Sequence, residues 1–314
     1  TVANTQPSNG STFYTRGISI TRSNVVLDGM KHYVTGEGTD GAPYFGILFT
    51  QNCANITVKN CTFTAHKLYY NIGSAGQRVG QGTYDISPFM TMNLTFENCT
   101  QTTDILDSAY WGIIATNGCK NITLDGCNFS RFDAHRGAWN VTIKNSTLGY
   151  QGINMIGGGT MTVENSTVYG TNFVDLRLDY GSTWDGDLII RNCTWYPNQG
   201  KAVSGTVTLI GGSYDTLHDF GYECYMPHTI TIDGLTVMDT RASGAYRGVT
   251  LLSDFVPGNT SPNYDIKMLQ AGKRLYHLTT ELTIRGFAAK SGKDWILCPN
   301  TYLFRDLVIH DLDA

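Results

Sequence analysis

Three ionisable residues cluster in the segment Phe132-Asp133-Ala134-His135-Arg136-Gly137. A histidine can accept a proton near neutral pH, a neighbouring aspartate can orient its imidazole, and an arginine supplies a fixed positive charge. Such a cluster stands out because only 15% of the residues are charged. The segment predicts acid–base chemistry with His135 as the base and Asp133 as the residue that orients it. A surface Asp–Arg pair beside a histidine bonded to the backbone is the alternative interpretation.

A second segment, residues 175–179, reads Asp-Leu-Arg-Leu-Asp. Side chains alternate between the two faces of a strand, so Asp175, Arg177 and Asp179 should share one face while the leucines point inward. These three charges would lie one or two coils from His135 if the chain is a stack of coils. A self-neutralising ladder of surface charges is the alternative interpretation.

A short repeated phrase predicts how these segments are positioned. It reads Ile-Thr-Val-Lys-Asn-Cys-Thr from residue 56, and copies begin at residues 94, 122, 141, 161 and 188, with weaker ones at 207, 230 and 282. Apolar and polar residues alternate in each copy, which indicates a strand with one buried face. The Asn or Gly that follows tolerates a left-handed backbone and suits a corner. A constant phrase at variable spacing predicts an all-β solenoid whose coils carry insertions.

Cysteine placement favours buried thiols over disulfides. Cys61, Cys99, Cys127 and Cys193 occupy one point of the phrase, and Cys53 and Cys119 another. Equivalent points of stacked coils form ladders of small buried side chains, a role that reduced cysteine fills. The Asn-x-Ser/Thr patterns, for example at Asn55, Asn60 and Asn98, are explained in the same way. We expect these asparagines to be inward or laddered instead of glycosylated.

The sequence resembles the pectate-lyase-like group of right-handed parallel β-helix proteins. The matching features are the ladder of Cys61, Cys99, Cys127, Ser146, Ser166 and Cys193 and the set of Asn60, Asn98, Asn145, Asn165 and Asn192 beside it. The resemblance covers roughly residues 15–240, with weaker copies beyond, and implies a single-stranded solenoid. We expect residues 1–314 to form one such domain, which is a fragment of a longer protein if the chain continues. The group includes lyases, hydrolases, epimerases and phage tailspikes, so the resemblance indicates the fold more strongly than the chemistry.

Insertions after equivalent strands of a solenoid gather on one side and can form a groove. Coils lie about 4.8 Å apart, so residues of adjacent insertions can converge. The expected substrate-binding residues are polar or aromatic: His66, Lys67, Asp104, Trp139, Gln151, Asn154, Asp175, Asp179 and Tyr180.

The first functional hypothesis is a lyase that cleaves a uronic-acid-containing polysaccharide by β-elimination. Arg136 and Arg177 would bind the uronate carboxylate in bidentate fashion, and His135 would remove the adjacent proton. Asp133 would orient the imidazole, and Tyr150 would protonate the leaving oxygen. An epimerase shares the first proton abstraction.

Two alternatives to the lyase and the related epimerase stay open. A glycoside hydrolase would use two carboxyl groups, Asp175 and Asp179 or either of them with Asp133, although the full motif set of the polygalacturonase-like hydrolases is absent. The other alternative is a non-catalytic glycan-binding module of adhesin or tailspike type, with a homotrimer in the tailspike case. We expect no cofactor, but a calcium-assisted lyase would recruit Asp175, Asp179, Asp185 and Asp187 as oxygen ligands.

The charge and the hydrophobic pattern of the sequence limit the classes of binding partner that we expect. The net charge is −4, and no basic cluster could neutralise a run of phosphates, so nucleic acid is not an expected partner. No apolar run is long enough to span a bilayer. A polysaccharide substrate predicts an extracellular, cell-surface or periplasmic location.

Overall fold

The described part of the chain consists of strands and short connections. The computed structural model describes residues 2–4, 17–34, 47–65, 69–72, 78–81, 84–107, 110, 113–177, 183–197, 205–212, 224–238, 246–253, 276–289, 295–296 and 304–313. None of these residues forms a helix that is long and apolar enough to cross a membrane.

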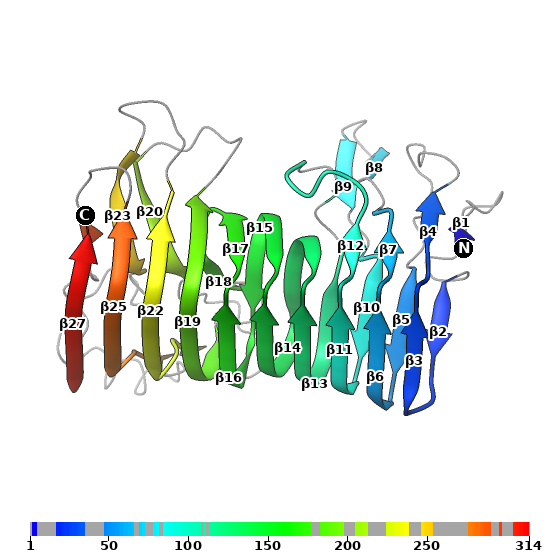
Figure 1. Cartoon of the computed structure of the whole chain (residues 1–314), viewed down its shortest axis with the longest axis horizontal. Coiled ribbons are helices and arrows are strands. Elements are labelled where there is room, and N and C mark those ends of the chain that lie inside the picture. Colours follow the sequence, from blue (N-terminus) through cyan, green and yellow to red (C-terminus); the bar gives the residue numbers. More distant parts are fainter. Residues whose placement is uncertain are drawn as a thin grey trace.

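The strands stack in three columns that together form consecutive coils along the long axis of the molecule (Figure 1). We call the first column, which carries the cluster described below, the site column. It contains β2 (Ile18–Ile20), β5 (Leu48–Gln51), β10 (Ile86–Phe89), parts of β13 (Ala115–Asp125), β14 (Asn128–Lys144) and β15 (Thr147–Met155), then β18 (Val174–Leu176), β20 (Gly205–Gly211), β23 (Tyr246–Leu252) and β26 (Trp295–Ile296).

The second column, the phrase column, holds the repeated phrase. Its strands are β3 (Val25–Asp28), β6 (Ala54–Lys59), β11 (Met92–Glu97), the later parts of β13 and β14, β16 (Gly157–Glu164), β19 (Trp184–Pro197), β22 (Thr229–Val237), β25 (Glu281–Ala289) and β27 (Asp306–Asp313).

The third column is made of β7 (Thr62–Phe63), β12 (Thr100–Gln101), the starts of β14 and β15, β17 (Thr167–Gly170) and the ends of β19, β22 and β25. Three small pairs form two-stranded sheets of their own: β1 (Val2–Asn4) with β4 (His32–Val34), β8 (Tyr69–Ile72) with β9 (Arg78–Gln81), and β21 (Cys224–Tyr225) with β24 (Tyr276–His277). Among the described pairings only β8–β9 is antiparallel, so the predicted all-β architecture of parallel coils is confirmed.

Asparagine forms the corners of the coils because its backbone tolerates positive φ. Asn60, Asn98, Asn145, Asn165 and Asn192 end the phrase with φ between 49° and 53°. At a second corner, the side-chain amide of Asn55 donates to Oδ1 of Asn24, and successive coils repeat this bond at Asn93, Asn121 and Asn140. Asn55, Asn60 and Asn98 are exposed. Asn55 is therefore laddered, as expected, through its bonds with Asn24 and Asn93, whereas the expectation of inward side chains is wrong for all three residues.

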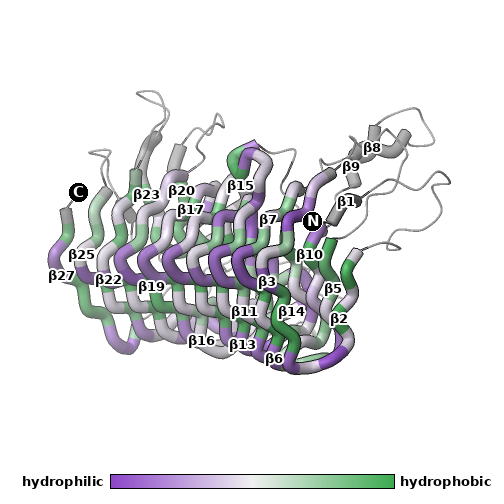
Figure 2. Tube along the Cα trace, turned by 45° about the vertical axis from the view of Figure 1, so that its right-hand side comes forward, coloured by the Kyte–Doolittle hydropathy of each residue, from purple (hydrophilic) through white to green (hydrophobic). Residues whose placement is uncertain are grey.

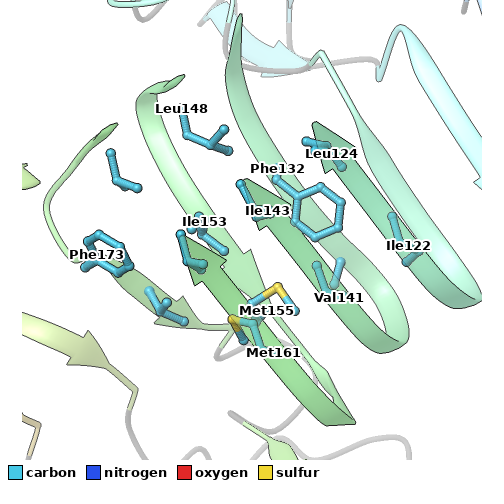
Figure 3. Close-up of a cluster of buried hydrophobic side chains, with 14 of the residues drawn as sticks. Ile122, Leu124, Phe132, Val141, Ile143, Leu148, Ile153, Met155, Met161 and Phe173 are labelled. Carbon is cyan, nitrogen blue, oxygen red and sulfur yellow. The ribbon is translucent and has the colours of Figure 1, made fainter. Parts of the chain in front are cut away.

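Hydrophobic and hydrophilic residues recur at equivalent points of successive coils (Figure 2). Apolar side chains fill the inside of the coils (Figure 3). Cys61, Cys99, Cys127 and Cys193 form the expected buried ladder, and their thiols donate to backbone carbonyls, as from Cys99 Sγ to Val58 O at 3.4 Å. Cys53 and Cys119 are also free and buried, so the expectation of buried thiols holds for the described cysteines.

Candidate active site

The centre of β14 turns three polar side chains to one face. Phe132 and Ala134 are completely buried in the core, while Arg131, Asp133 and His135 alternate with them and point outward. Figure 3 shows the ring of Phe132 packed with its core neighbours. Strand alternation therefore places Arg131, Asp133 and His135 together on the outer face.

Asp133 is the centre of a network of donors although it is wholly buried. Its Oδ2 accepts from Nη1 of Arg177 at 2.5 Å and from the hydroxyl of Tyr84 at 2.5 Å. Nη2 of Arg131 lies 2.9 Å from the same oxygen. His135 Nδ1 lies 3.7 Å from it, which is too long for a good hydrogen bond. We call Tyr84, Arg131, Asp133, His135 and Arg177 the Asp133 cluster.

Parallel register brings the following coils into the same network. Asp133 pairs with Asn154 of β15, and Asn154 pairs with Asp175 of β18, so these three residues form a row across three coils. Nε of Arg131 donates to Oδ1 of Asn154 at 2.5 Å. Arg177 lies two positions after Asp175 and therefore on the same face. The predicted convergence of His135 and Arg177 on one side of the stack is what the structure has.

Tyr84 enters the cluster from the residues just before β10. Its hydroxyl lies 3.3 Å from His135 Nδ1, and the two rings are tilted at 54° with centroids 5.1 Å apart. The guanidinium carbon of Arg131 lies 5.8 Å from the centre of the tyrosine ring. Nη1 of Arg131 and Nη1 of Arg177 also donate to the Tyr84 hydroxyl, at 3.4 and 3.5 Å, so the phenol contacts the imidazole, the carboxylate and both guanidinium groups.

The far end of the row is held by amides. Asp175 accepts from Nδ2 of Asn154 at 3.3 Å and from Nδ2 of Asn172 at 3.0 Å. Gly211 is the register partner of Asp175 on the next coil, and a Cβ on this glycine would collide with the Asn172 amide. Absence of a side chain at Gly211 therefore makes room for the amide that holds Asp175.

The environment drives the pKa values of the two carboxyl groups apart. Burial alone would raise the pKa of Asp133, but His135 and the charges of Arg131 and Arg177 outweigh it, so the pKa lies below its ordinary value. Burial raises the pKa of Asp175, and the amides and arginines offset this only in part. Burial is also the main cause that raises the pKa of Tyr84 to about 12. Near neutral pH, Asp133 is ionised and Tyr84 is protonated.

Other predicted residues lie elsewhere. Arg136 is exposed and is the register partner of Asn117, because a register shift between β13 and β14 follows His135. Arg131, not Arg136, is the β14 arginine that contacts Asp133. Trp139 lies beyond the bend at Gly137, where φ is 95°, and belongs to the phrase column.

Two predicted residues lie near the turn at residues 102–107. Asp104 is exposed and accepts from the backbone N–H of Leu106 at 2.9 Å, so it caps its own turn. The backbone N–H of Tyr150 donates to Ile105 O, and Tyr150 is not among the residues whose contacts define the Asp133 cluster. Gln151 is in β15, but its side chain lies outside the described structure, as do residues His66, Lys67, Asp179 and Tyr180.

The aspartates considered for calcium are separated. Asp185 contacts Nε2 of His228 at 3.1 Å, and Asp187 accepts from the Thr229 hydroxyl at 2.6 Å. Asp175 is bonded to amides as described above. Within the described ranges, no three His, Cys, Asp or Glu side chains gather in a way that could hold a metal ion.

Sequence reasoning did not identify Tyr84, Arg131 or Asn172. Arg131 was recoverable, because it precedes Asp133 by two positions and strand alternation puts both on one face. Tyr84 and Asn172 lie outside the alternating segments, and only the folding of the coils brings them to the row.

Residues 46–214, more than half of the 314 residues, match the model of a family described as right handed beta helix region. No curated protein matches the chain.

Proposed function

The chain belongs to the right-handed β-helix family, and on that premise we propose that it is an enzyme that cleaves a uronic-acid-containing polysaccharide by β-elimination. One observation carries this proposal: two guanidinium groups and a half-buried imidazole surround one buried carboxylate. The finer resemblance to pectate-lyase-like proteins belongs to the same proposal.

The charges of the Asp133 cluster suit an anionic substrate. Arg131 and Arg177 carry two positive charges against the single negative charge of ionised Asp133, which leaves an excess of one positive charge with neutral His135. Guanidinium groups bind carboxylates strongly because both partners are planar and can form two parallel hydrogen bonds. A uronate carboxylate next to the cluster would compensate the excess charge.

The reaction needs a base and a group that withdraws charge. His135 takes the proton from the carbon next to the substrate carboxylate, the C–H electron pair forms the new carbon–carbon double bond, and the bond to the glycosidic oxygen breaks. Arginines that bind the carboxylate stabilise the negative charge that develops there. Tyr150 stays the predicted proton donor for the leaving oxygen, because the Tyr84 hydroxyl already donates to Asp133.

Asp133 acts through His135. Nδ1 of the imidazole faces the carboxylate and the Tyr84 hydroxyl, so Nε2 is the nitrogen assigned to the substrate proton. Because Asp133 is fully buried, we assign it a positioning role and no direct contact with substrate. We also propose an extracellular, cell-surface or periplasmic location, since large polysaccharides do not diffuse through membranes.

The test is incubation with a panel of uronic-acid polymers, followed by ultraviolet absorbance of the unsaturated product. His135→Ala should lower kcat by at least about 100-fold, and Arg131→Gln should also lower activity. Arg136→Gln is the matched control, because this exposed arginine lies outside the Asp133 cluster and should leave activity near the parent value. Equal losses in the two arginine variants, or no absorbance with any polymer, would refute the proposal.

A specific observation favours hydrolysis as the second candidate. Asp133 has a lowered pKa and Asp175 a raised one, which is the arrangement expected of a base and an acid. The two residues are two coils apart, roughly 9 to 10 Å along the stack, close to the carboxyl separation of inverting glycosidases. Complete burial of Asp133 weighs against this role.

The reaction products distinguish the lyase from the hydrolase. A hydrolase releases reducing ends without a new double bond, and its activity would be lost in Asp175→Asn but retained in His135→Ala. Binding of the polymer without any cleavage would instead indicate a glycan-binding module.

A further inference from the structure

Trp139 is an exposed aromatic residue of the phrase column, and its indole lies against two glycines of the next coil. Its residue surface is 43% exposed. A Cβ added to Gly158 would lie 2.5 Å from Cζ3 of the indole, and one added to Gly159 would lie 2.9 Å from its Nε1. These atoms belong to opposite ends of the indole, so the ring system extends across both glycines. The indole therefore packs against Gly158 and Gly159, and there is room for it because neither residue has a side chain.

The residues beside Trp139 combine apolar surface with a positive charge. In the parallel register Trp139 pairs with Lys120 on the preceding coil, and Lys120 pairs with Met92 on the coil before that. Lys120 is exposed, and Met92 is 50% exposed. Phe89 and Met90, at the same corner as Met92, are 44% and 52% exposed. Large apolar patches of this kind on a protein surface usually indicate a binding function.

We propose that Trp139 and Lys120 form a platform on which a sugar ring of an anionic polysaccharide stacks, in addition to the Asp133 cluster. This inference rests on the polymer class of the proposed function, and it is independent of the cleavage chemistry. The indole offers a wide apolar face with a polar edge. Lys120, about 4.8 Å away along the stack, supplies a cation for a carboxylate on the same or the next sugar.

An extended polymer fits this surface better than a globular partner does. Met92, Lys120 and Trp139 form a straight row with one residue per coil. A chain with a regular repeat can contact such a row at equal intervals. On the next two coils the row continues with Gly158 and Asp185. Because Gly158 has no side chain, the indole of Trp139 occupies the space above it and forms the surface at this point of the row.

The experiment measures binding separately from cleavage. In the His135→Ala background, the affinity for polygalacturonic acid and for alginate is measured by retardation in polymer-containing native gels and by titration calorimetry. Trp139→Ala should weaken binding by about tenfold, whereas Trp139→Phe, which keeps an aromatic face, should stay within about threefold. Lys120→Glu should weaken binding at low salt, and this loss should shrink at high salt.

Tyr33→Ala is the matched control, because Tyr33 is an aromatic residue of similar exposure, 44%, on β4 near the start of the stack. Unchanged affinity in both Trp139→Ala and Lys120→Glu would overturn the inference. Sedimentation that shows a dimer of the parent protein and a monomer of Trp139→Ala, with polymer binding unchanged, would overturn it in favour of self-association. Retained binding with no cleavage by the parent protein would refute only the elimination reaction, whereas no binding of either polymer would refute both.

Discussion

The substitution Asp133→Asn tests how strongly the buried carboxylate holds the cluster together. The side chains of Arg131 and Arg177 are only 10% and 12% exposed, and Asp133 is the anion between them. Removing one partner of a buried ion pair leaves an uncompensated charge and costs about 3–5 kcal/mol. Because Arg131 keeps its bond to Asn154, we expect the lower end, a loss of about 3 kcal/mol in the free energy of unfolding at pH 7.

Urea denaturation followed by circular dichroism measures this loss. Asp125→Asn is the matched control, because Asp125 forms a half-exposed pair with Lys144 at 3.2 Å, and surface pairs contribute less than about 1 kcal/mol. The lowered pKa of Asp133 also makes the free energy of unfolding depend on pH. The stabilisation by the ionised carboxylate is complete above the pKa of an unfolded aspartate, near 3.9, and is lost as the pH falls through the lower pKa of the folded state. The reasoning is wrong if the two variants lose equal stability at pH 7.

Three further predictions concern the row from Tyr84 to Gly211. Tyr84→Phe removes a donor to Asp133 and should lower the free energy of unfolding by about 1.5 kcal/mol, measured in urea; no loss would mean that the 2.5 Å bond contributes nothing. Since the pKa of Asp175 is raised, its carboxyl binds a proton at higher pH in the folded state than in the unfolded state. The free energy of unfolding should therefore rise as the pH is lowered from neutral through the folded pKa, and level off below the unfolded pKa near 3.9. Asp175→Asn should abolish this slope in urea titrations between pH 4 and 7, and an unchanged slope would exclude Asp175 as its source. Gly211→Ala should cost about 1–3 kcal/mol because its Cβ collides with the Asn172 amide, and a crystal structure with that amide unmoved would contradict this.

The repeated phrase was sufficient to predict the coils, because its signals are local. Alternation of apolar and polar residues selects strands, and asparagine at the end of the phrase selects a positive-φ corner, as at Asn60 and Asn145. The equivalence of Cys61 and Cys99 predicted their buried ladder. Each of these features depends on a few neighbouring residues and on stacking with a copy of the same pattern.

Alternation also predicted that Asp175 and Arg177 share a face, and the repeat placed them one or two coils from His135. The pattern of ionisable residues pointed to Arg136, although strand alternation puts Arg131, and not Arg136, on the face of Asp133. What the sequence could not show is the register shift between β13 and β14 and the bend at Gly137, beside which Arg136 is exposed. Such irregularities result from packing between coils and leave no periodic signal.

Only the tertiary structure brought Tyr84 to Asp133, which is 49 residues away in the sequence. It also brought Asn172 and Gly211 to Asp175. Strand periodicity fixes the direction of a side chain within its own coil, whereas the lengths and paths of the connections fix which residues of other coils meet it. The sequence therefore determined the stack and the outward face of the site, and the three-dimensional path of the connections decided which side chains complete it.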